Sequence, residues 1–315
     1  MVDGMAKRRL LVTGSNGFVG GHVVSAAASD PQARFETVDF IDPETGTRPE
    51  LRDGEALARA IAAAEPDAVV HLAAIAAPRE AQKDPSQAWA VNLTGTLNLA
   101  HAILTHAPSC RLIWSGSSEV YGASFNREPL PILETAALEP LTAYGATKAA
   151  GDILLRQMAE DGLQATIFRP FNHTGPGQAA DYVVPAFAAQ IARIEKGLQE
   201  PVLKVGNLDA RRDFLDVRDV AAAYLAAAAA PGIVPGGRYN LSTANPVSIR
   251  DILDRLIALS SVEVEVVVDA DRYRPNHVEV ASGDNGRAFE AFGWTPRIAL
   301  TDTLRDVLDF QRSLL

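Results

Sequence analysis

Residues 9–170 alternate short apolar runs with longer alanine-rich segments, and this alternation restricts the fold more than any other feature of the chain. Apolar strands separated by helices pair in parallel and carry helices on both faces. The expected strands are 9–13, 34–39, 67–73, 111–117 and 165–170, and the expected helices between them are 17–28, 54–64, 85–104 and 143–160. The pattern predicts an α/β fold with a Rossmann-type doubly wound parallel sheet.

The alternation ends near residue 171, where Pro and Gly become more frequent. The segments expected beyond it are a helix at 216–229, a strand at 237–243, an amphipathic helix at 248–260 and a strand at 262–268. We therefore expect a dinucleotide-binding domain over 1–170, with return elements near 216–243, and a smaller, discontinuous α/β substrate-binding lobe over 171–315. A chain of 315 residues with 47% hydrophobic residues can bury cores of this size.

Charge and cysteine content exclude several classes of function. The formal net charge is −10 and the longest basic run is the Lys-Arg-Arg of residues 7–9, so we expect no nucleic acid partner. The single cysteine, Cys110, excludes an internal disulfide and a zinc site of several thiolates, and we expect no metal. The first ten residues lack the apolar segment of a signal peptide, and no apolar run is long enough to span a membrane. We expect a cytoplasmic protein without membrane association.

Three glycines follow the first expected strand in the segment VTGSNGFVGGHV. Gly14 permits a tight turn, Gly17 permits close approach of a pyrophosphate, and Gly20 lets the next helix pack near the sheet. Asp39 ends the second strand, where a carboxylate accepts hydrogen bonds from the adenosine ribose. Because this carboxylate repels a 2′-phosphate and the adjacent DFIDPE holds no basic residue, the sequence favours NAD(H) as the cofactor, and NADP(H) is possible. The predicted cofactor-binding residues are Gly14, Asn16, Gly17, Phe18, Val19, Asp39, Leu51, Leu72, Ala73, Ala74, Tyr144 and Lys148.

Tyr144 and Lys148 lie four residues apart at the start of an expected helix, so both side chains lie on one face. A lysine ammonium near a phenol favours the phenolate, and we expect Lys148 to lower the pKa of Tyr144. Ser117 ends the fourth expected strand, at the edge where doubly wound sheets bind ligands. Glu119, two residues later, is either an acid/base group or a solvated loop carboxylate.

Two further polar residues have a structural interpretation. His71 ends the third expected strand, where a packed or hydrogen-bonded side chain is the simplest role. Asn92 lies inside an expected helix although it is a poor helix former. It either bonds to nearby backbone or belongs to a water relay near the active site.

The segments TGSNGFVG, HLAA, VNLTGTLNL, SGSSEVYG, YGATK and RPFNHTGPGQ together resemble the extended short-chain dehydrogenase/reductase family, also described as NAD-dependent epimerases/dehydratases. The resemblance runs from residue 9 to about residue 300 and is to the enzymes of nucleotide-diphosphate sugars. Among these, the sequence most resembles GDP-4-keto-6-deoxy-D-mannose reductases and GDP-mannose 4,6-dehydratases.

The resemblance implies roles for individual residues. Ser117, Tyr144 and Lys148 would be the catalytic triad, with Glu119 as a further acid/base candidate. The implied substrate-binding residues are Ser118, Asn172, Arg212 and Arg274, with the two arginines on the diphosphate. Members of the family commonly dimerise through the helices at 85–104 and 143–160, so a homodimer is expected.

Three features favour the reductase over the dehydratase. Asp39 stands where the dehydratases carry basic residues for NADP, IDPETGTRPE replaces their arginine-rich loop, and FNHTGP replaces their FNHESP-type loop. The expected reaction is reduction of GDP-4-keto-6-deoxy-D-mannose to GDP-D-rhamnose, with hydride from NADH and a proton from Tyr144. The alternatives are a 4,6-dehydratase or C4 epimerase that uses Glu119, and a non-catalytic NAD(P)-binding sensor.

Overall fold

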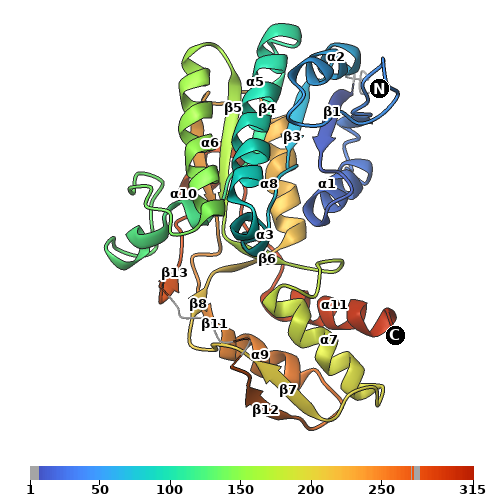
Figure 1. The fold of residues 1–315 in the computed structure, drawn as a ribbon, viewed down its shortest axis with the longest axis vertical. Coiled ribbons are helices and arrows are strands. Elements are labelled where there is room, and N and C mark those ends of the chain that lie inside the picture. The colour runs from blue at the N-terminus through green and yellow to red at the C-terminus, as the bar shows by residue number, and fades with distance from the viewer. Residues whose placement is uncertain (1–6, 271, 273–276) are drawn as a thin grey trace.

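The computed structural model describes residues 7–270, 272 and 277–315, and its main sheet has six strands in the order β10-β5-β4-β3-β1-β2 (Figure 1). Every neighbouring pair in this sheet is parallel. The strands are β1 (Arg8–Thr13), β2 (Phe35–Val38), β3 (Ala68–His71), β4 (Arg111–Ser115), β5 (Gln164–Pro170) and β10 (Gly237–Leu241). The doubly wound sheet predicted from the sequence is therefore confirmed, and its last strand comes from the second half of the chain.

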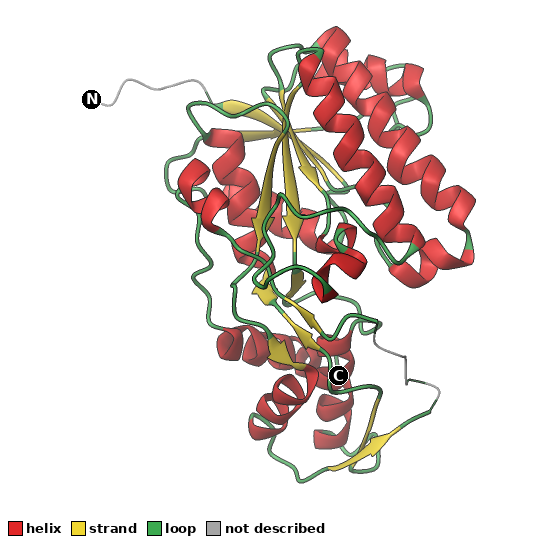
Figure 2. Ribbon diagram, turned by 90° about the vertical axis from the view of Figure 1, so that its left-hand side faces the viewer, coloured by secondary structure: helices red, strands yellow, loops and turns green. Residues whose placement is uncertain are grey.

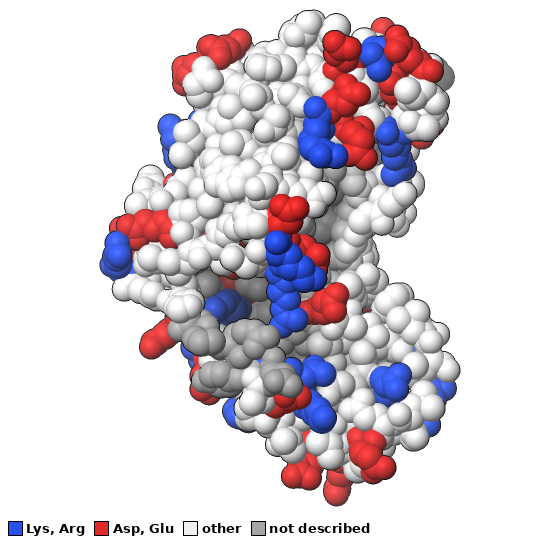
Figure 3. All heavy atoms as spheres, in the orientation of Figure 1, with Lys and Arg blue, Asp and Glu red and all other residues white. Residues whose placement is uncertain are grey.

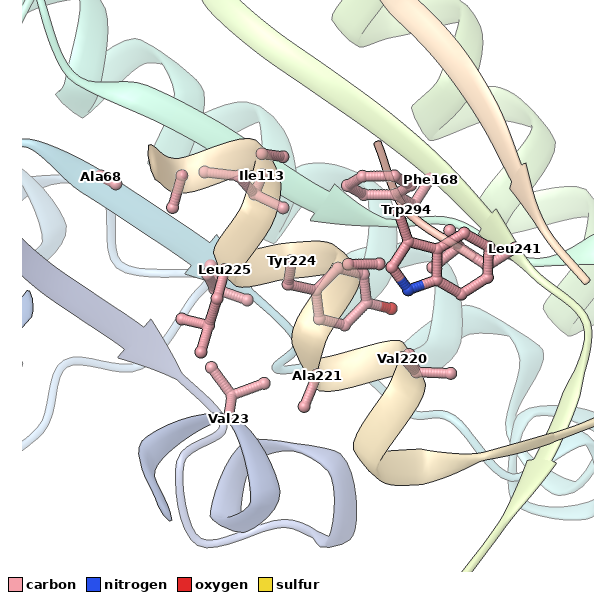
Figure 4. Close-up of a cluster of buried hydrophobic side chains, with 14 of the residues drawn as sticks. Val23, Ala68, Ile113, Phe168, Val220, Ala221, Tyr224, Leu225, Leu241 and Trp294 are labelled. Atoms are coloured by element: carbon pink, nitrogen blue, oxygen red, sulfur yellow. The ribbon is translucent and has the colours of Figure 1, made fainter. Parts of the chain in front are cut away.

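Helices cover both faces of this sheet (Figure 2). One face carries α1 (Phe18–Ala28) and α8 (Val217–Ala229), and the other carries α2 (Gly54–Ala64), α5 (Gly95–His106) and α6 (Ala143–Glu160). In the first layer, Val23 of α1 and Tyr224 of α8 pack against sheet residues such as Ile113 and Phe168 (Figure 4). These side chains are all fully or almost fully buried, so each layer contributes its own hydrophobic core.

A smaller part of the chain has a separate core and lies below the main sheet in Figure 1. Its helices are α7 (Val183–Glu195), α9 (Ile249–Ala258) and α11 (Leu300–Ser313). Its short strands form three small sheets, built from β6 (Asn172–Thr174) with β9 (Phe214–Asp216), β7 (Val202–Val205) with β12 (Glu265–Val268), and β8 (Arg211–Arg212) with β11 (Val247–Ser248) and β13 (Val280–Ala281). Helix α10 (Gly286–Phe292) returns to the main sheet beside β10.

Two strands end earlier than expected, and this shapes the carboxyl edge of the sheet. β3 stops at His71 because the next two N–H groups, of Leu72 and Ala73, donate to Thr13 Oγ1 at 3.2 Å each. β4 stops at Ser115, and the chain continues into the short helical turns η2 (Ser118–Val120) and η3 (Gly122–Asn126). Residues 72–74 and 116–119 therefore leave the sheet as loops at the edge where a ligand would bind.

The single helix expected over 85–104 is interrupted by a π-helical turn. The chain forms α3 (Pro78–Lys83), α4 (Pro85–Trp89), the π-turn η1 (Ala90–Thr94) and then α5. Asn92 lies in the π-turn and is 2% exposed. Single π-helical turns inside α-helices occur most often at functional sites. Across the described ranges 7–270, 272 and 277–315, no helix combines the length and apolar character needed to cross a bilayer.

Candidate active site

The turn between β1 and α1 fits the pyrophosphate of a dinucleotide. Gly14 has φ of +72°, and a Cβ there would lie 2.9 Å from Ala73 N. A Cβ on Gly20 would lie 2.1 Å from Gly14 O, so only glycine allows this turn and helix to pack so closely. Gly17 caps α1 without a side-chain hydrogen bond. The N–H groups of the first turn of α1 are thus left for an anion, which the helix dipole also favours.

A cavity of about 430 Å³ joins this turn to the proposed catalytic residues. Of the residues predicted from the sequence, it is lined by Gly14, Gly17, Phe18, Val19, Leu72, Ala73, Ala74, Ser117, Ser118, Glu119, Tyr144, Lys148 and Asn172. The fold therefore brings together residues that come from five separate segments of the chain. The predicted convergence at the carboxyl edge of the sheet is present in the structure.

Ser117, Tyr144 and Lys148 form one wall of the cavity. The Ser117 hydroxyl lies near the Tyr144 hydroxyl and lowers its pKa. Ser117 Oγ also accepts from Glu119 N at 3.1 Å, which fixes the serine rotamer. Lys148 Nζ donates to Ser115 O at 2.6 Å and lies 5.9 Å from the centre of the Tyr144 ring. Two hydroxyls and an ammonium group are thus held within one site.

The pKa values of this set differ from the sequence-based expectation. Burial raises the pKa of Tyr144, the hydrogen bond from Ser117 offsets this only in part, and the Glu119 charge raises it further. The net shift is opposite to the lowering of the Tyr144 pKa expected from Lys148, because desolvation outweighs the interactions that favour the phenolate. Burial also lowers the pKa of Lys148 itself to about 7. Tyr144 is therefore a proton donor at neutral pH.

Glu119 faces the same cavity, and its pKa is raised. Enclosure by the surrounding protein is the main cause, and the Arg212 charge and a hydrogen bond from Thr142 oppose it. Thr142 Oγ1 also accepts from Gly145 N at 2.9 Å and caps α6. The carboxyl group therefore lies near the start of the helix that carries Tyr144.

A buried chain of hydrogen bonds begins at Thr13, at the end of β1. Thr96 Oγ1 donates to Asn92 O at 2.7 Å, so it accepts from His71 Nε2 at 3.1 Å. His71 Nδ1 then accepts from the Thr13 hydroxyl at 2.7 Å, and the Thr13 oxygen accepts the two N–H groups of residues 72–73. Burial lowers the pKa of His71 to about 3, which keeps the ring neutral as this arrangement requires. The predicted hydrogen-bonded role of His71 agrees with these contacts.

The chain continues from the π-turn to the catalytic helix. Asn92 Oδ1 accepts from Ile75 N at 2.8 Å, and its amide donates to Ile75 O and to Thr147 Oγ1 at 3.1 Å each. Thr147 Oγ1 donates in turn to Tyr144 O at 2.8 Å. Asn92 therefore bonds to backbone, as one of its two expected roles requires, and also links residue 75 to the first turn of α6. The water-relay role stays a prediction.

The loop after β5 presents Asn172 to the cavity. Asn172 is exposed there, while its neighbours are used to close the loop. Thr174 Oγ1 donates to Gln178 Oε1 at 2.7 Å, and Gln178 Nε2 donates to His173 O at 3.1 Å. The His173 ring stacks on Phe18 with a centroid distance of 6.4 Å. The loop is thus braced by its own side chains, with one amide turned to the cavity.

Arg212 lies on β8, beside a second cavity of about 650 Å³. This cavity is lined by four basic residues, Arg79, Lys204, Arg212 and Arg272, with Asp181 as its acidic residue. Figure 3 shows basic side chains around a hollow between the upper and lower parts of the molecule. Neighbouring residues of two segments line the two cavities: Pro78, Ala179 and Tyr182 line the first, and Arg79, Ala180, Asp181 and Val183 line the second. The two cavities are therefore adjoining parts of one cleft. Sequence reasoning identified only Arg212, because the other basic residues lie in segments without a motif.

Three of the predicted residues that the structure describes lie elsewhere. Asn16 and Asp39 line a third cavity, of about 300 Å³, together with Arg48, which no sequence motif marks. Leu51 is a core residue, buried against Gly95 of α5, and lines none of these three cavities. Arg274 lies outside the described residues.

Comparisons with known proteins agree with this architecture. Residues 10–242 match the model of the NAD dependent epimerase/dehydratase family. The chain is 36% identical over 309 residues to GDP-6-deoxy-D-mannose reductase from Pseudomonas aeruginosa, covering 96% of each protein. It superposes on the solved structure of RMD from Pseudomonas aeruginosa complexed with NADPH with a TM-score of 0.88, 34% identity, and coverage of 99% of this chain and 100% of the other. For Thermus thermophilus UDP-glucose 4-epimerase in complex with NAD, the TM-score is 0.80 at 27% identity, with 98% and 100% of the chains covered. The chain therefore belongs to the NAD dependent epimerase/dehydratase family.

Proposed function

We propose that this protein is an NAD(P)H-dependent reductase that converts GDP-4-keto-6-deoxy-D-mannose to GDP-D-rhamnose. The observation that carries the proposal is the convergence of Ser117, Tyr144 and Lys148 on the cavity that also contains the glycine turn. The similarity to a GDP-6-deoxy-D-mannose reductase over nearly the whole chain supports the choice of substrate.

The side chains suit reduction of a ketone. Bound NADH or NADPH supplies a hydride to C4 of the sugar. The Ser117 hydroxyl is placed to donate to the C4 oxygen and orient the carbonyl. Tyr144, whose raised pKa keeps it protonated, gives its proton to the alkoxide that forms at this oxygen. Lys148, in its charged form, stabilises the resulting phenolate.

The adjoining basic cavity suits the rest of the substrate. We propose that Arg212 binds the diphosphate and that Asn172 contacts it from the loop after β5. A guanidinium forms paired hydrogen bonds with phosphate oxygens. A protein of net charge −10 would bind a dianion here because basic residues cluster beside Arg212, namely Arg79, Lys204 and Arg272. We place Arg274 in the same group from its sequence position alone.

Glu119 supports a second candidate function. A 4,6-dehydratase must also remove a proton at C5 and expel the C6 hydroxyl, which requires an acid/base group beside the triad. Glu119 lines the cavity and has a raised pKa, as such a group requires. Incubation with GDP-D-mannose separates the two functions: a dehydratase converts it to the 4-keto-6-deoxy sugar with no net use of NADH, and the reductase leaves it unchanged.

We also propose a homodimer that pairs through α4–α5 and α6. Trp89 at the end of α4 and Ile153 of α6 are exposed by 39% and 59%, and dimerisation would remove both from water. Light scattering on the purified protein should give twice the mass of the chain, and the mass of a single chain would contradict this.

A panel of nucleotides tests the substrate proposal directly. The melting temperature is measured with GDP, UDP, dTDP or CDP, each in the presence of NADPH. A ligand at about 100 times its Kd adds about 2.7 kcal/mol to the free energy of unfolding, which gives a clear shift. GDP should stabilise the protein most. Stabilisation by UDP or dTDP without stabilisation by GDP would exclude the proposed substrate.

A further inference from the structure

A small cavity lies at the end of the main sheet where the adenosine ribose of a dinucleotide binds in this fold. It has a volume of about 300 Å³ and contains Ser15 and Asn16 from the glycine turn and Asp39 from the end of β2. Arg48, nine residues beyond Asp39, lines the same cavity. The cavity thus holds one carboxylate and one guanidinium, of which the sequence pattern revealed only the first.

The segment that carries Arg48 is a hairpin fixed to α2. Asp42 N donates to Thr47 O and Gly46 N donates to Asp42 O, both at 2.8 Å. The Asp42 carboxylate is 1% exposed and accepts two hydrogen bonds from Arg59 of α2, at 2.9 and 2.7 Å. Arg59 belongs to helix α2, so its hydrogen bonds to Asp42 hold the hairpin at a fixed position. Arg48 directly follows the hairpin, and its backbone therefore has a defined position beside the cavity.

In the part of the chain that the structure describes, the Arg48 side chain does not stabilise the fold through polar contacts. It is exposed and takes part in no hydrogen bond or ion pair there. The neighbouring Arg52, by contrast, pairs with Glu50 at 3.9 Å and lies outside this cavity. An unpaired guanidinium beside a ribose site is suited to an additional phosphate group.

We propose that Arg48 binds the 2′-phosphate of NADPH, so that this chain accepts both NADPH and NADH. In NADH, the Asp39 carboxylate accepts hydrogen bonds from the ribose hydroxyls. In NADPH, Arg48 offsets the repulsion between Asp39 and the 2′-phosphate, and Ser15 and Asn16 supply neutral donors. This changes the expectation of NAD(H) preference, which rested on Asp39 and on the absence of a basic residue from the adjacent DFIDPE. The inference depends on the dinucleotide-binding fold and is independent of the proposed sugar substrate.

Isothermal titration calorimetry with 2′,5′-ADP and 5′-AMP tests this without turnover. These ligands differ in the 2′-phosphate and contain neither nicotinamide nor sugar substrate. Arg48→Ala should weaken 2′,5′-ADP binding by about 10-fold to 100-fold, the range for loss of a hydrogen bond to a charged group, and change 5′-AMP binding far less. Arg52→Ala is the matched control and should leave both affinities as in the wild-type protein.

The opposite charge change gives an independent check. Asp39→Asn should strengthen 2′,5′-ADP binding, because it removes the repulsion between the carboxylate and the 2′-phosphate. It should weaken 5′-AMP binding, because an amide accepts hydrogen bonds from the ribose hydroxyls less strongly than a carboxylate does. Equal 2′,5′-ADP affinities of the wild-type and Arg48→Ala proteins would overturn the proposal. Because Arg48 is exposed and unpaired, Arg48→Ala should melt at the wild-type temperature. If the reductase proposal failed and Arg48→Ala still lost 2′,5′-ADP affinity, the cofactor inference would stand.

Discussion

The two adjoining parts of the cleft are built in different ways. Around the catalytic residues, the chain from Thr13 through His71 and Asn92 to Tyr144 is buried and continuously hydrogen-bonded. The basic cavity draws its residues from helix ends, loops and short strands. The first part fixes the positions of reacting groups, and the second provides charge to hold a substrate. Changes in the first should therefore lower kcat, and changes in the second should raise KM.

The largest effect should follow Tyr144→Phe. It removes the proton donor and leaves the ring packing in place, so kcat should fall by about 10²–10⁴-fold. Stopped-flow or steady-state absorbance of NADPH with the keto sugar measures this. Calorimetry with 2′,5′-ADP should show an unchanged cofactor site. Retention of more than a tenth of wild-type kcat would show that another group supplies the proton.

Arg212→Ala should affect the basic cavity, the second part of the cleft. Loss of a charge-assisted hydrogen bond to the diphosphate should raise the KM for the nucleotide sugar by about 10-fold to 100-fold, with a much smaller change in kcat. Arg211→Ala is the matched control, since Arg211 is the exposed neighbour and donates to Pro246 O. Equal KM values for the two variants would remove Arg212 from the substrate site.

Asn92→Ala should give the smallest of the three effects on catalysis, together with a loss of stability. It leaves the part-buried Ile75 N–H and C=O without their partner, at about 1–3 kcal/mol for each group, and removes one of the two hydrogen bonds of Thr147 Oγ1. We expect kcat to fall by about 10-fold while the KM for the nucleotide sugar stays near its wild-type value. The control for stability alone is Asn98→Ala. Asn98 lies in α5, and its amide donates to Leu51 O. Should both variants keep full kcat at a temperature where they are folded, the link to Tyr144 would have no catalytic role.

The sequence predicted the features that depend on local pattern. Strand and helix order, the glycine turn and the convergence of Ser117, Tyr144 and Lys148 follow from hydrophobic periodicity and from the rule that ligands bind at the carboxyl edge of such sheets. The burial of Leu51 against Gly95 depends on contacts distant in sequence, so local pattern could not predict it.

The remaining features depend on the surroundings of each residue in the folded protein, which local sequence pattern does not predict. The raised pKa of Tyr144 results from desolvation, which no spacing of Tyr and Lys reveals. Arg48 reaches the cofactor cavity because the Asp42–Arg59 pair fixes a hairpin to α2, an interaction across 17 residues. The π-turn at Asn92 likewise reflects tertiary hydrogen bonds to Ile75 and Thr147.

Transfer of deuterium from the cofactor tests the central claim most directly. The protein is incubated with GDP-4-keto-6-deoxy-D-mannose and NADPH that carries deuterium at the transferred position, and the product is analysed by mass spectrometry and NMR. The reductase should give GDP-D-rhamnose with one deuterium at C4 for each NADPH oxidised. Recovery of the unreduced keto sugar with no oxidation of NADPH or NADH would contradict it.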